Sequence, residues 1–359
     1  SLYPVWSKLT EESVRASTRT AVCELLLSGC TTTVDHHYVF SKALSRAIDV
    51  QAEEIKSLGI RAILTRGSMS LSRENGGLPP SNVVQTEDVI LKDSERLIDR
   101  WHDHSEGAML QIALAPCSPF SVTEELMSAS AQLAREKKVL LHTHLAETSD
   151  ENSFCENLYG CRPLDYLEKV GWLSSYVWLA HGIHFSSEEI QRLGRTKTGI
   201  CHCPSSNMTL ASGFCSVEEL RAAGAPVGLG VDGSSSNDSS NLMQELRQAY
   251  LLQRLRLGAE KFSHIDALEL ATTEGARLLN RDDIGEIREG ACADLALFST
   301  DELRFAGAHD PLAALVLSGA HRAEAVMVDG EWKVRNGELL DVDLEEILES
   351  QKKAALALV

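Results

Sequence analysis

The chain has 359 residues, with 34 lysine and arginine residues against 52 aspartate and glutamate residues, a formal net charge of −18. Hydrophobic residues make up 43% of the sequence, which is typical of a folded globular protein and excludes extensive disorder. The acidic balance argues against nucleic-acid binding and against a basic membrane-surface protein. No apolar run approaches the length of a membrane span, so we expect no membrane partner.

The cysteine content favours a reducing compartment. Nine cysteines are present, an odd number, and several lie in apolar stretches that we expect to be buried. No secretory signal is visible at Ser1, where a basic segment and an apolar segment would be expected. We therefore predict free thiols and a cytoplasmic location.

Strand patterns alternate with helix patterns along most of the chain. Apolar positions at helical spacing predict helices at residues 10–28 and 41–58, and capping sequences predict helix starts near residues 121 and 186. Two more helices are expected near residues 240–257 and 263–279. The strands predicted between the helices are residues 31–35, 61–65, 109–115, 139–144, 177–181, 199–203 and 227–231.

This alternation predicts an α/β fold with parallel strands joined by helical crossovers. The fold class that we expect is a (β/α)8 TIM-type barrel, in which the seven strands found would be strands two to eight. Strand one would then lie upstream of Ser1. The alternative is an open doubly wound sheet, but no glycine-rich phosphate-binding fingerprint favours it.

The last quarter of the chain has a different pattern. From residue 285, short β segments and the turn sequences Asp-Gly and Asn-Gly replace the alternation. We therefore predict an N-terminally incomplete hydrolase barrel at residues 1–284, a β-sandwich portion at residues 285–342 and a helical tail at residues 343–359.

Three predicted strands end in side chains that suit metal-dependent hydrolysis. His144 and Glu147 follow one strand, His181 ends the next, and Asp232 follows the last. Imidazole and carboxylate bind divalent metals, and a bound metal makes water a stronger nucleophile near neutral pH. Each residue alone could be a core histidine or a turn carboxylate, and His142, on the same strand face as His144, is an alternative ligand. Their shared position at one end of the barrel favours a site.

The combined motifs resemble those of the amidohydrolase superfamily, in the branch of cytosine, guanine and adenosylhomocysteine deaminases and triazine hydrolases. The matching stretches are HTHLAET (142–148), LAHGIH (179–184), CPSSN (203–207), GVDGSSSND (230–238), ATTEGARLL (271–279) and GEIREGACADLALF (285–298). The stretches at 28–40, 114–122 and 142–148 look nearest to 8-oxoguanine deaminases. The resemblance covers essentially the whole chain.

The resemblance implies a role for each matching residue. His144 and Asp232 match metal ligands, Glu147 matches the carboxylate that moves protons to the substrate, and His181 matches a histidine that contacts water or substrate. Asp232 also matches the base that deprotonates the water. The family's strand-one His-x-His pair is absent, so two further ligands are expected upstream of Ser1. One divalent metal is implied, zinc first and iron as the alternative.

The function expected from this resemblance is hydrolytic deamination of a purine-type base, most specifically 8-oxoguanine to urate and ammonia. Arg66, Cys117 and Tyr38 are the candidate substrate-binding residues, although Arg66 could equally be a surface charge. A small-molecule nucleobase is the expected partner, and a homo-oligomer is expected. The alternatives are another deaminase or triazine hydrolase of the branch, or a catalytically silent, truncated relative.

Overall fold

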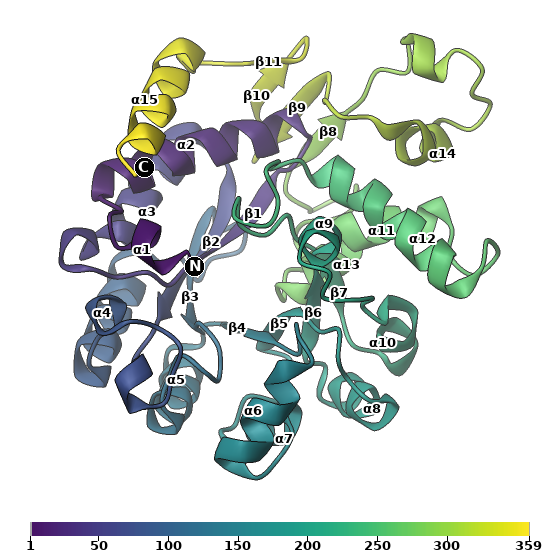
Figure 1. Ribbon diagram of the computed structural model, residues 1–359. Helices are drawn as coiled ribbons and strands as arrows, with labels where there is room; N and C mark the ends of the chain where they lie inside the picture. Colours follow the sequence, from purple (N-terminus) through teal and green to yellow (C-terminus); the bar gives the residue numbers. More distant parts are fainter. Residues whose placement is uncertain (1, 359) are drawn as a thin grey trace.

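The computed structural model describes residues 2–358. Residues 1 and 359 lie outside the described residues. They are the first position of the predicted barrel segment and the last position of the predicted helical tail. Figure 1 shows an arc of strands with helices around its outer side. No helix among residues 2–358 is both long enough and apolar enough to cross a lipid bilayer.

Within residues 2–358, seven parallel strands form the main sheet, and each pairs with the next one along the chain. No pairing joins β1 to β7 in this part of the chain, so the curled sheet is open between them. The prediction of a TIM-type barrel is confirmed, with the seven strands close to their predicted positions. The strands are β1 (Thr32–His37), β2 (Arg61–Ser68), β3 (Leu110–Pro116), β4 (Leu141–Leu145), β5 (Val177–His181), β6 (Gly199–His202) and β7 (Val227–Leu229).

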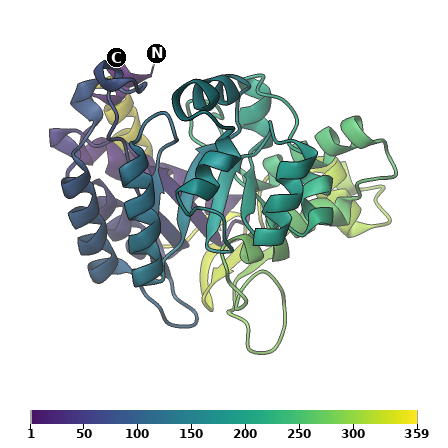
Figure 2. The ribbon, with the colours of Figure 1, turned by 90° about the horizontal axis from the view of Figure 1, so that it is seen from below.

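Helices cover the outer face of this sheet, as the rotated view in Figure 2 also shows. Polar side chains begin several of them: Thr123 accepts a hydrogen bond from the amide of Leu126, and Ser186 and Glu189 form the predicted capping box. The helices are α1 (Tyr3–Trp6), α2 (Glu11–Leu27), α3 (Ala47–Leu58), α4 (Glu87–Trp101), α5 (Glu124–Lys137), α6 (Asp150–Tyr159), α7 (Pro163–Lys169), α8 (Ser187–Thr196), α9 (Pro204–Thr209), α10 (Val217–Ala223), α11 (Leu242–Leu257), α12 (His264–Ala271), α13 (Thr273–Leu278), α14 (Pro311–Ala314) and α15 (Leu344–Leu356).

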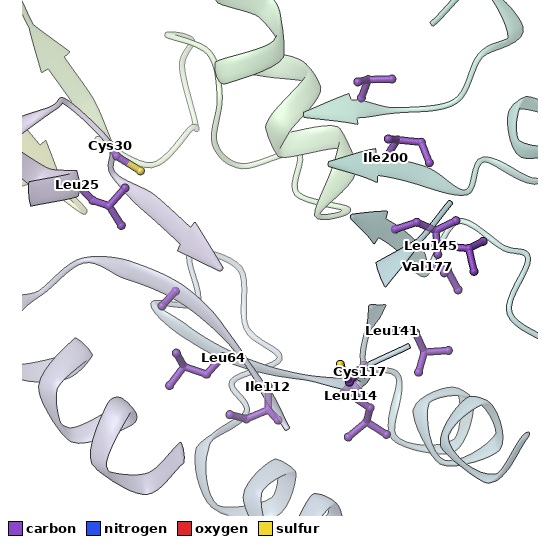
Figure 3. Close-up of a cluster of buried hydrophobic side chains, with 14 of the residues drawn as sticks. Leu25, Cys30, Leu64, Ile112, Leu114, Cys117, Leu141, Leu145, Val177 and Ile200 are labelled. Carbon is purple, nitrogen blue, oxygen red and sulfur yellow. The ribbon is translucent and has the colours of Figure 1, made fainter. Parts of the chain in front are cut away.

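Alternation along each strand divides the apolar side chains between two layers. Outward-facing residues such as Leu64 and Ile112 belong to the main core between sheet and helices, part of which Figure 3 shows. Their neighbours Ile63 and Ala113 join Trp178 in a second buried cluster on the concave face of the sheet. The position of a residue along its strand, odd or even (its parity), therefore decides whether its side chain points toward the helices or into the barrel.

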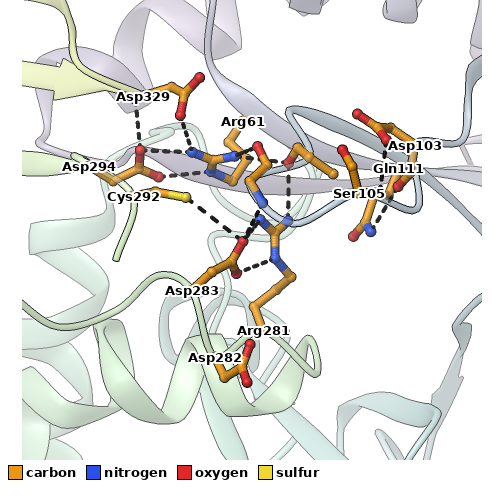
Figure 4. Close-up of polar contacts among 12 residues, drawn as sticks. Arg61, Asp103, Ser105, Gln111, Arg281, Asp282, Asp283, Cys292, Asp294 and Asp329 are labelled. Carbon is orange, nitrogen blue, oxygen red and sulfur yellow. Dashed lines mark hydrogen bonds and ion pairs between the residues drawn. The ribbon is translucent and has the colours of Figure 1, made fainter. Parts of the chain in front are cut away.

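A separate antiparallel sheet follows the barrel, with the order β11-β10-β9-β8. It consists of β8 (Leu295–Leu297), β9 (Ala325–Val328), β10 (Glu331–Arg335) and β11 (Glu338–Leu339), and α15 then lies against α2. Arg61, the first residue of β2, connects this sheet to the barrel through a bidentate hydrogen-bonded ion pair with Asp294 (Figure 4). The exact segment boundaries, at residues 284 and 342, stay predictions.

Candidate functional site

The strand ends bring the predicted catalytic side chains together. In the parallel register, His144 pairs with Ala180 and Leu145 pairs with His181, so β4 and β5 end side by side. The Nε2 atom of His181 lies 3.8 Å from an oxygen of Glu147 and 3.9 Å from an oxygen of Asp232. Three residues predicted from separate strand ends therefore surround one point at the carboxyl end of the barrel.

His144 has the orientation of a metal ligand. Its Nδ1 lies 2.7 Å from the carbonyl oxygen of Cys117, so Nδ1 carries the hydrogen and donates it. Its Nε2 is then left with a lone pair, which is the usual arrangement of a metal-binding imidazole. The ring is also stacked on that of His181, with centroids 5.5 Å apart.

His181 is oriented by Asn207, which lies in α9, the short helix after β6. The amide oxygen of Asn207 accepts a hydrogen bond of 3.0 Å from Nδ1 of His181, and both residues are 1% exposed. This contact turns Nε2 toward the two carboxylates. Asn207 therefore fixes the direction in which His181 presents its second nitrogen.

The backbone at the strand ends is unusual. Ala146, His181 and Asp232 have φ angles of +55°, +74° and +61°. Side chains other than glycine rarely adopt this left-handed region, and each such residue costs on the order of 1 kcal/mol or more unless its surroundings impose it. Three of these conformations at one edge of the sheet mark the place where the fold tolerates strain.

Burial and neighbouring charges separate the pKa values at the site. Burial lowers the pKa of both His144 and His181 and raises the pKa of Glu147. Burial also opposes the charge of Asp232, but His181 and His144 outweigh it and hold the Asp232 pKa below its usual value. One carboxyl group with a raised pKa beside one with a lowered pKa suits a division into proton carrier and base.

The three candidate substrate-binding residues do not share one location. Tyr38 contacts the ring of His144 edge-on, with centroids 5.7 Å apart, and Cys117 is buried at the end of β3, where burial raises the pKa of its thiol to about 12. Arg66 lies on the same face of β2 as the outward-facing Leu64, so its side chain points away from the barrel interior. Its guanidinium donates to Asp93 and Gln85, so its placement does not favour contact with a substrate.

Two residues near the site lie outside the predicted set, and only one of them has a signal in the sequence. Trp6, in a four-residue helix, contacts the ring of Tyr38 at 5.8 Å, and nothing in the local sequence indicates this distant contact. His36 stacks on His144 at 4.7 Å, and its buried Nδ1 has no partner among the described residues. The period-two alternation of β1 does place His36 on the barrel side, so that signal was present.

The donor set fits a divalent metal only in part. His144 offers a free Nε2 and Asp232 a carboxylate with a lowered pKa, which are suitable ligands. Among residues 2–358, however, no group of three or more histidine, cysteine or acidic side chains is arranged to hold a metal ion.

Comparison with known proteins agrees with this geometry. The sequence model of the amidohydrolase family matches residues 2–333, so the chain belongs to the amidohydrolase family. An 8-oxoguanine deaminase of Pseudomonas aeruginosa is 59% identical over 359 residues, covering 100% of this chain and 80% of the relative.

Solved structures show the same fold with a metal present. The atrazine chlorohydrolase of Arthrobacter aurescens, complexed with zinc, superimposes with a TM-score of 0.92 at 34% identity, over 98% of this chain and 78% of that one. An adenosine deaminase from Xanthomonas campestris with bound zinc gives a TM-score of 0.90 at 26% identity, over 100% of this chain and 78% of that one. The chain therefore has the fold of a metal-dependent hydrolase, and a divalent metal is its cofactor.

Proposed function

We propose that the protein hydrolyses 8-oxoguanine to urate and ammonia. The observation that carries this proposal is the 59% identity with an 8-oxoguanine deaminase over the whole chain. The convergence of Glu147, His181 and Asp232 at the carboxyl end of the barrel supports hydrolysis as the reaction class. The substrate is a small molecule, and water is the second reactant.

The site residues divide the proton transfers between them. Asp232, whose pKa is lowered, takes a proton from the attacking water, and Glu147, whose pKa is raised, delivers its proton to the ring nitrogen. Glu147 then takes the proton of the added hydroxyl group and delivers it to the departing amine, and the proton held by Asp232 returns to Glu147 through solvent. Water adds to the carbon that bears the exocyclic amine, the carbon–nitrogen bond breaks, and ammonia leaves. His181 stabilises the oxygen that gains negative charge when Nε2 holds a proton, since Nδ1 already donates to Asn207 and only the protonated ring donates from both nitrogens.

The metal in this proposal is zinc, with iron as the alternative, and His144 and Asp232 would hold it. When bound, it supplies Lewis-acid activation of water near neutral pH. Zinc is supported by the zinc-containing structures of similar proteins. We further propose that ligands in addition to His144 and Asp232 complete the coordination of the metal.

Substrate recognition is assigned to Tyr38 and Cys117. Tyr38 contacts His144 and is flanked by the ring of Trp6, so it forms one wall beside the predicted ligand. Cys117 contributes its carbonyl oxygen to the orientation of His144 and its thiol to the buried end of β3. A homo-oligomeric state and a cytoplasmic location stay predictions.

A comparison of substrates tests the proposal. Ammonia release from 8-oxoguanine, guanine and cytosine, and chloride release from a chlorinated triazine, are measured with the metal-loaded full-length protein, and kcat/KM is expected to be highest for 8-oxoguanine. A pocket whose buried polar groups pair with an additional ring oxygen disfavours analogues that lack it, by roughly 10⁴-fold or more. Preference for guanine, cytosine or the triazine would contradict the substrate, and no ammonia from any of the three bases would contradict the reaction.

A further inference from the structure

One buried carboxylate organises the segment that carries Glu147. Glu151, in the first turn of α6, is 4% exposed. Its two oxygens accept hydrogen bonds from three successive backbone amides, those of Ala146 at 2.5 Å, Glu147 at 2.7 Å and Thr148 at 3.1 Å. Three amide donors that converge on one carboxylate form a compact anion-binding arrangement of the main chain.

This arrangement joins the loop before α6 to the first turn of the helix. Ser149 occupies the N-cap position of α6 but makes no capping hydrogen bond with its side chain. The amides of Glu151 and Asn152 donate to the carbonyl oxygens of Thr148 and Ser149. Here Glu151 satisfies the amides of the preceding segment, so the loop and the helix are joined through this side chain.

The same segment is fixed from its other side. The carbonyl oxygen of Ala146 accepts hydrogen bonds from the amides of Ile183 at 2.8 Å and His184 at 2.9 Å, directly after His181. Ala146 itself has a φ of +55°, which it adopts only under external constraint. The peptide groups of residue 146 therefore connect Glu151 on one side with the His181 loop on the other.

We propose that Glu151 is a positioning residue for the deamination reaction, which holds the Glu147 backbone so that the Glu147 carboxylate faces Nε2 of His181. This inference rests on the proposed function, because it assigns the proton transfer to Glu147. A carboxylate is required because an amide offers one acceptor oxygen for three donors and turns its NH2 group toward an amide hydrogen. The role acts through the main chain, and Glu151 does not touch the substrate.

The test compares Glu151→Gln with Asp150→Asn, which removes one charge from an exposed position of the same helix turn. We expect Glu151→Gln to lower kcat by about 10- to 100-fold while KM and metal content stay within about twofold, the size of effect seen for residues that orient catalytic groups. Asp150→Asn is expected to leave kcat unchanged. Unchanged kcat in Glu151→Gln would overturn the proposal.

A double variant separates positioning from general structural damage. If Glu151 acts only through Glu147, then Glu147→Gln combined with Glu151→Gln is no slower than Glu147→Gln alone, within about twofold. A double variant whose kcat is reduced by the product of the two single-variant losses would overturn the proposal. If Glu147→Gln alone kept normal turnover, the proposed function of Glu147 would fail instead, so the two failures are distinguishable.

Hydrogen exchange in the wild-type protein provides a readout that does not depend on activity or on the folding of a variant. The amides of residues 146–148 should exchange slowly despite their position in a loop, because Glu151 accepts from all three. Rapid exchange of these amides would overturn the proposal even if Glu151→Gln could not be folded. Slow exchange in the wild type and faster exchange confined to these amides in Glu151→Gln would support it.

Discussion

At the amino end of the barrel, two buried arginines are matched by carboxylates, whereas at the carboxyl end Glu147 and Asp232 have no lysine or arginine partner among residues 2–358. Arg61 is 1% exposed, and its guanidinium donates to both oxygens of Asp294 and to the carbonyl groups of the loop before β3 (Figure 4). Arg281 pairs with Asp283 in the same region, and its hydrogen bonds hold the Asp283 pKa well below the usual range. This region joins the barrel to the small sheet.

The carboxyl end also contains carboxylates, but these carboxylates are not paired with arginine side chains. Within residues 2–358, no salt bridge joins Glu147 or Asp232 to a lysine or arginine, and each faces His181 at nearly 4 Å. Two of the three residues with a left-handed backbone at this end, His181 and Asp232, carry site side chains. The difference teaches that charge is neutralised where the fold needs stability and left available where chemistry needs it.

The largest effect is expected at the unmatched end. Asp232→Asn should lose stoichiometric metal and reduce turnover by at least about 10³-fold, because the amide is a poor ligand and cannot take a proton. Asparagine tolerates the left-handed backbone at this position, so the fold should persist. Metal analysis and ammonia release measure both effects, with Asp238→Asn in the same loop as the control. Full metal content in Asp232→Asn would show that the ligand is misassigned.

At the matched end, Arg61→Met should affect stability instead. Removal of one partner leaves Asp294 buried and unpaired, which typically costs about 3–5 kcal/mol in free energy of unfolding. The metal-loaded variant should keep its kcat, since the ion pair lies at the other end of the barrel. Arg288→Met, in an exposed pair with Glu286, should cost less than about 1 kcal/mol in denaturant titrations. Equal losses of unfolding free energy in Arg61→Met and Arg288→Met would contradict the assignment of a stabilising role to the buried ion pair.

A smaller effect is expected at Asn207, the residue that orients His181. Asn207→Ala removes the acceptor for Nδ1 of His181 and should lower kcat by about 10- to 100-fold with little change in the free energy of unfolding. Steady-state kinetics on 8-oxoguanine, with His181→Asn and the double variant measured in parallel, tests this. Additive losses in the double variant would mean that Asn207 does not act through His181.

The smallest effect concerns acid sensitivity. His202 is buried, neither ring nitrogen has a hydrogen-bond partner among the described residues, and burial lowers its pKa to about 3. The unfolded ring binds a proton below pH 6.5 and the folded ring does not until about pH 3, so stability is complete above pH 6.5 and decreases as the pH falls toward 3.

When the pH is lowered from 7 to 5, the free energy of unfolding should decrease in both proteins. The decrease should be about 1–2 kcal/mol smaller in His202→Phe than in wild type. The exposed His309 supplies the control variant, His309→Asn, which should keep the wild-type dependence. Unfolding titrations at the two pH values measure the difference. Identical pH dependence in His202→Phe and wild type would contradict the burial argument.

The strands and most of the site could be predicted because both depend on local pattern. Parity places His142 and His144 on the concave face, and the carboxyl ends of parallel strands meet at one edge. By the same parity, Trp178 and Ala180 point inward and His181 should point toward the helices. Its φ of +74° breaks the alternation and turns it into the site, a change that arises from tertiary constraint.

Other features depend on contacts between distant segments. Arg66 is an exception, because it lies on the same strand face as Leu64, and alternation alone directs it toward α4, where it meets Asp93. The contact between Trp6 and Tyr38 joins a short terminal helix to β1, and no periodicity indicates it. Glu151 lies four residues after Glu147, but its role follows from three backbone amides that only the folded loop aligns.

The central claim is that the unmatched carboxylate Glu147 carries the proton in hydrolytic deamination. The most direct measurement is the rate of ammonia release from 8-oxoguanine by wild type and Glu147→Gln at matched metal content. We expect Glu147→Gln to bind metal normally and to lose about 10³-fold in kcat, because the amide cannot move a proton. A variant that binds metal fully and retains more than about one tenth of the wild-type kcat would contradict it.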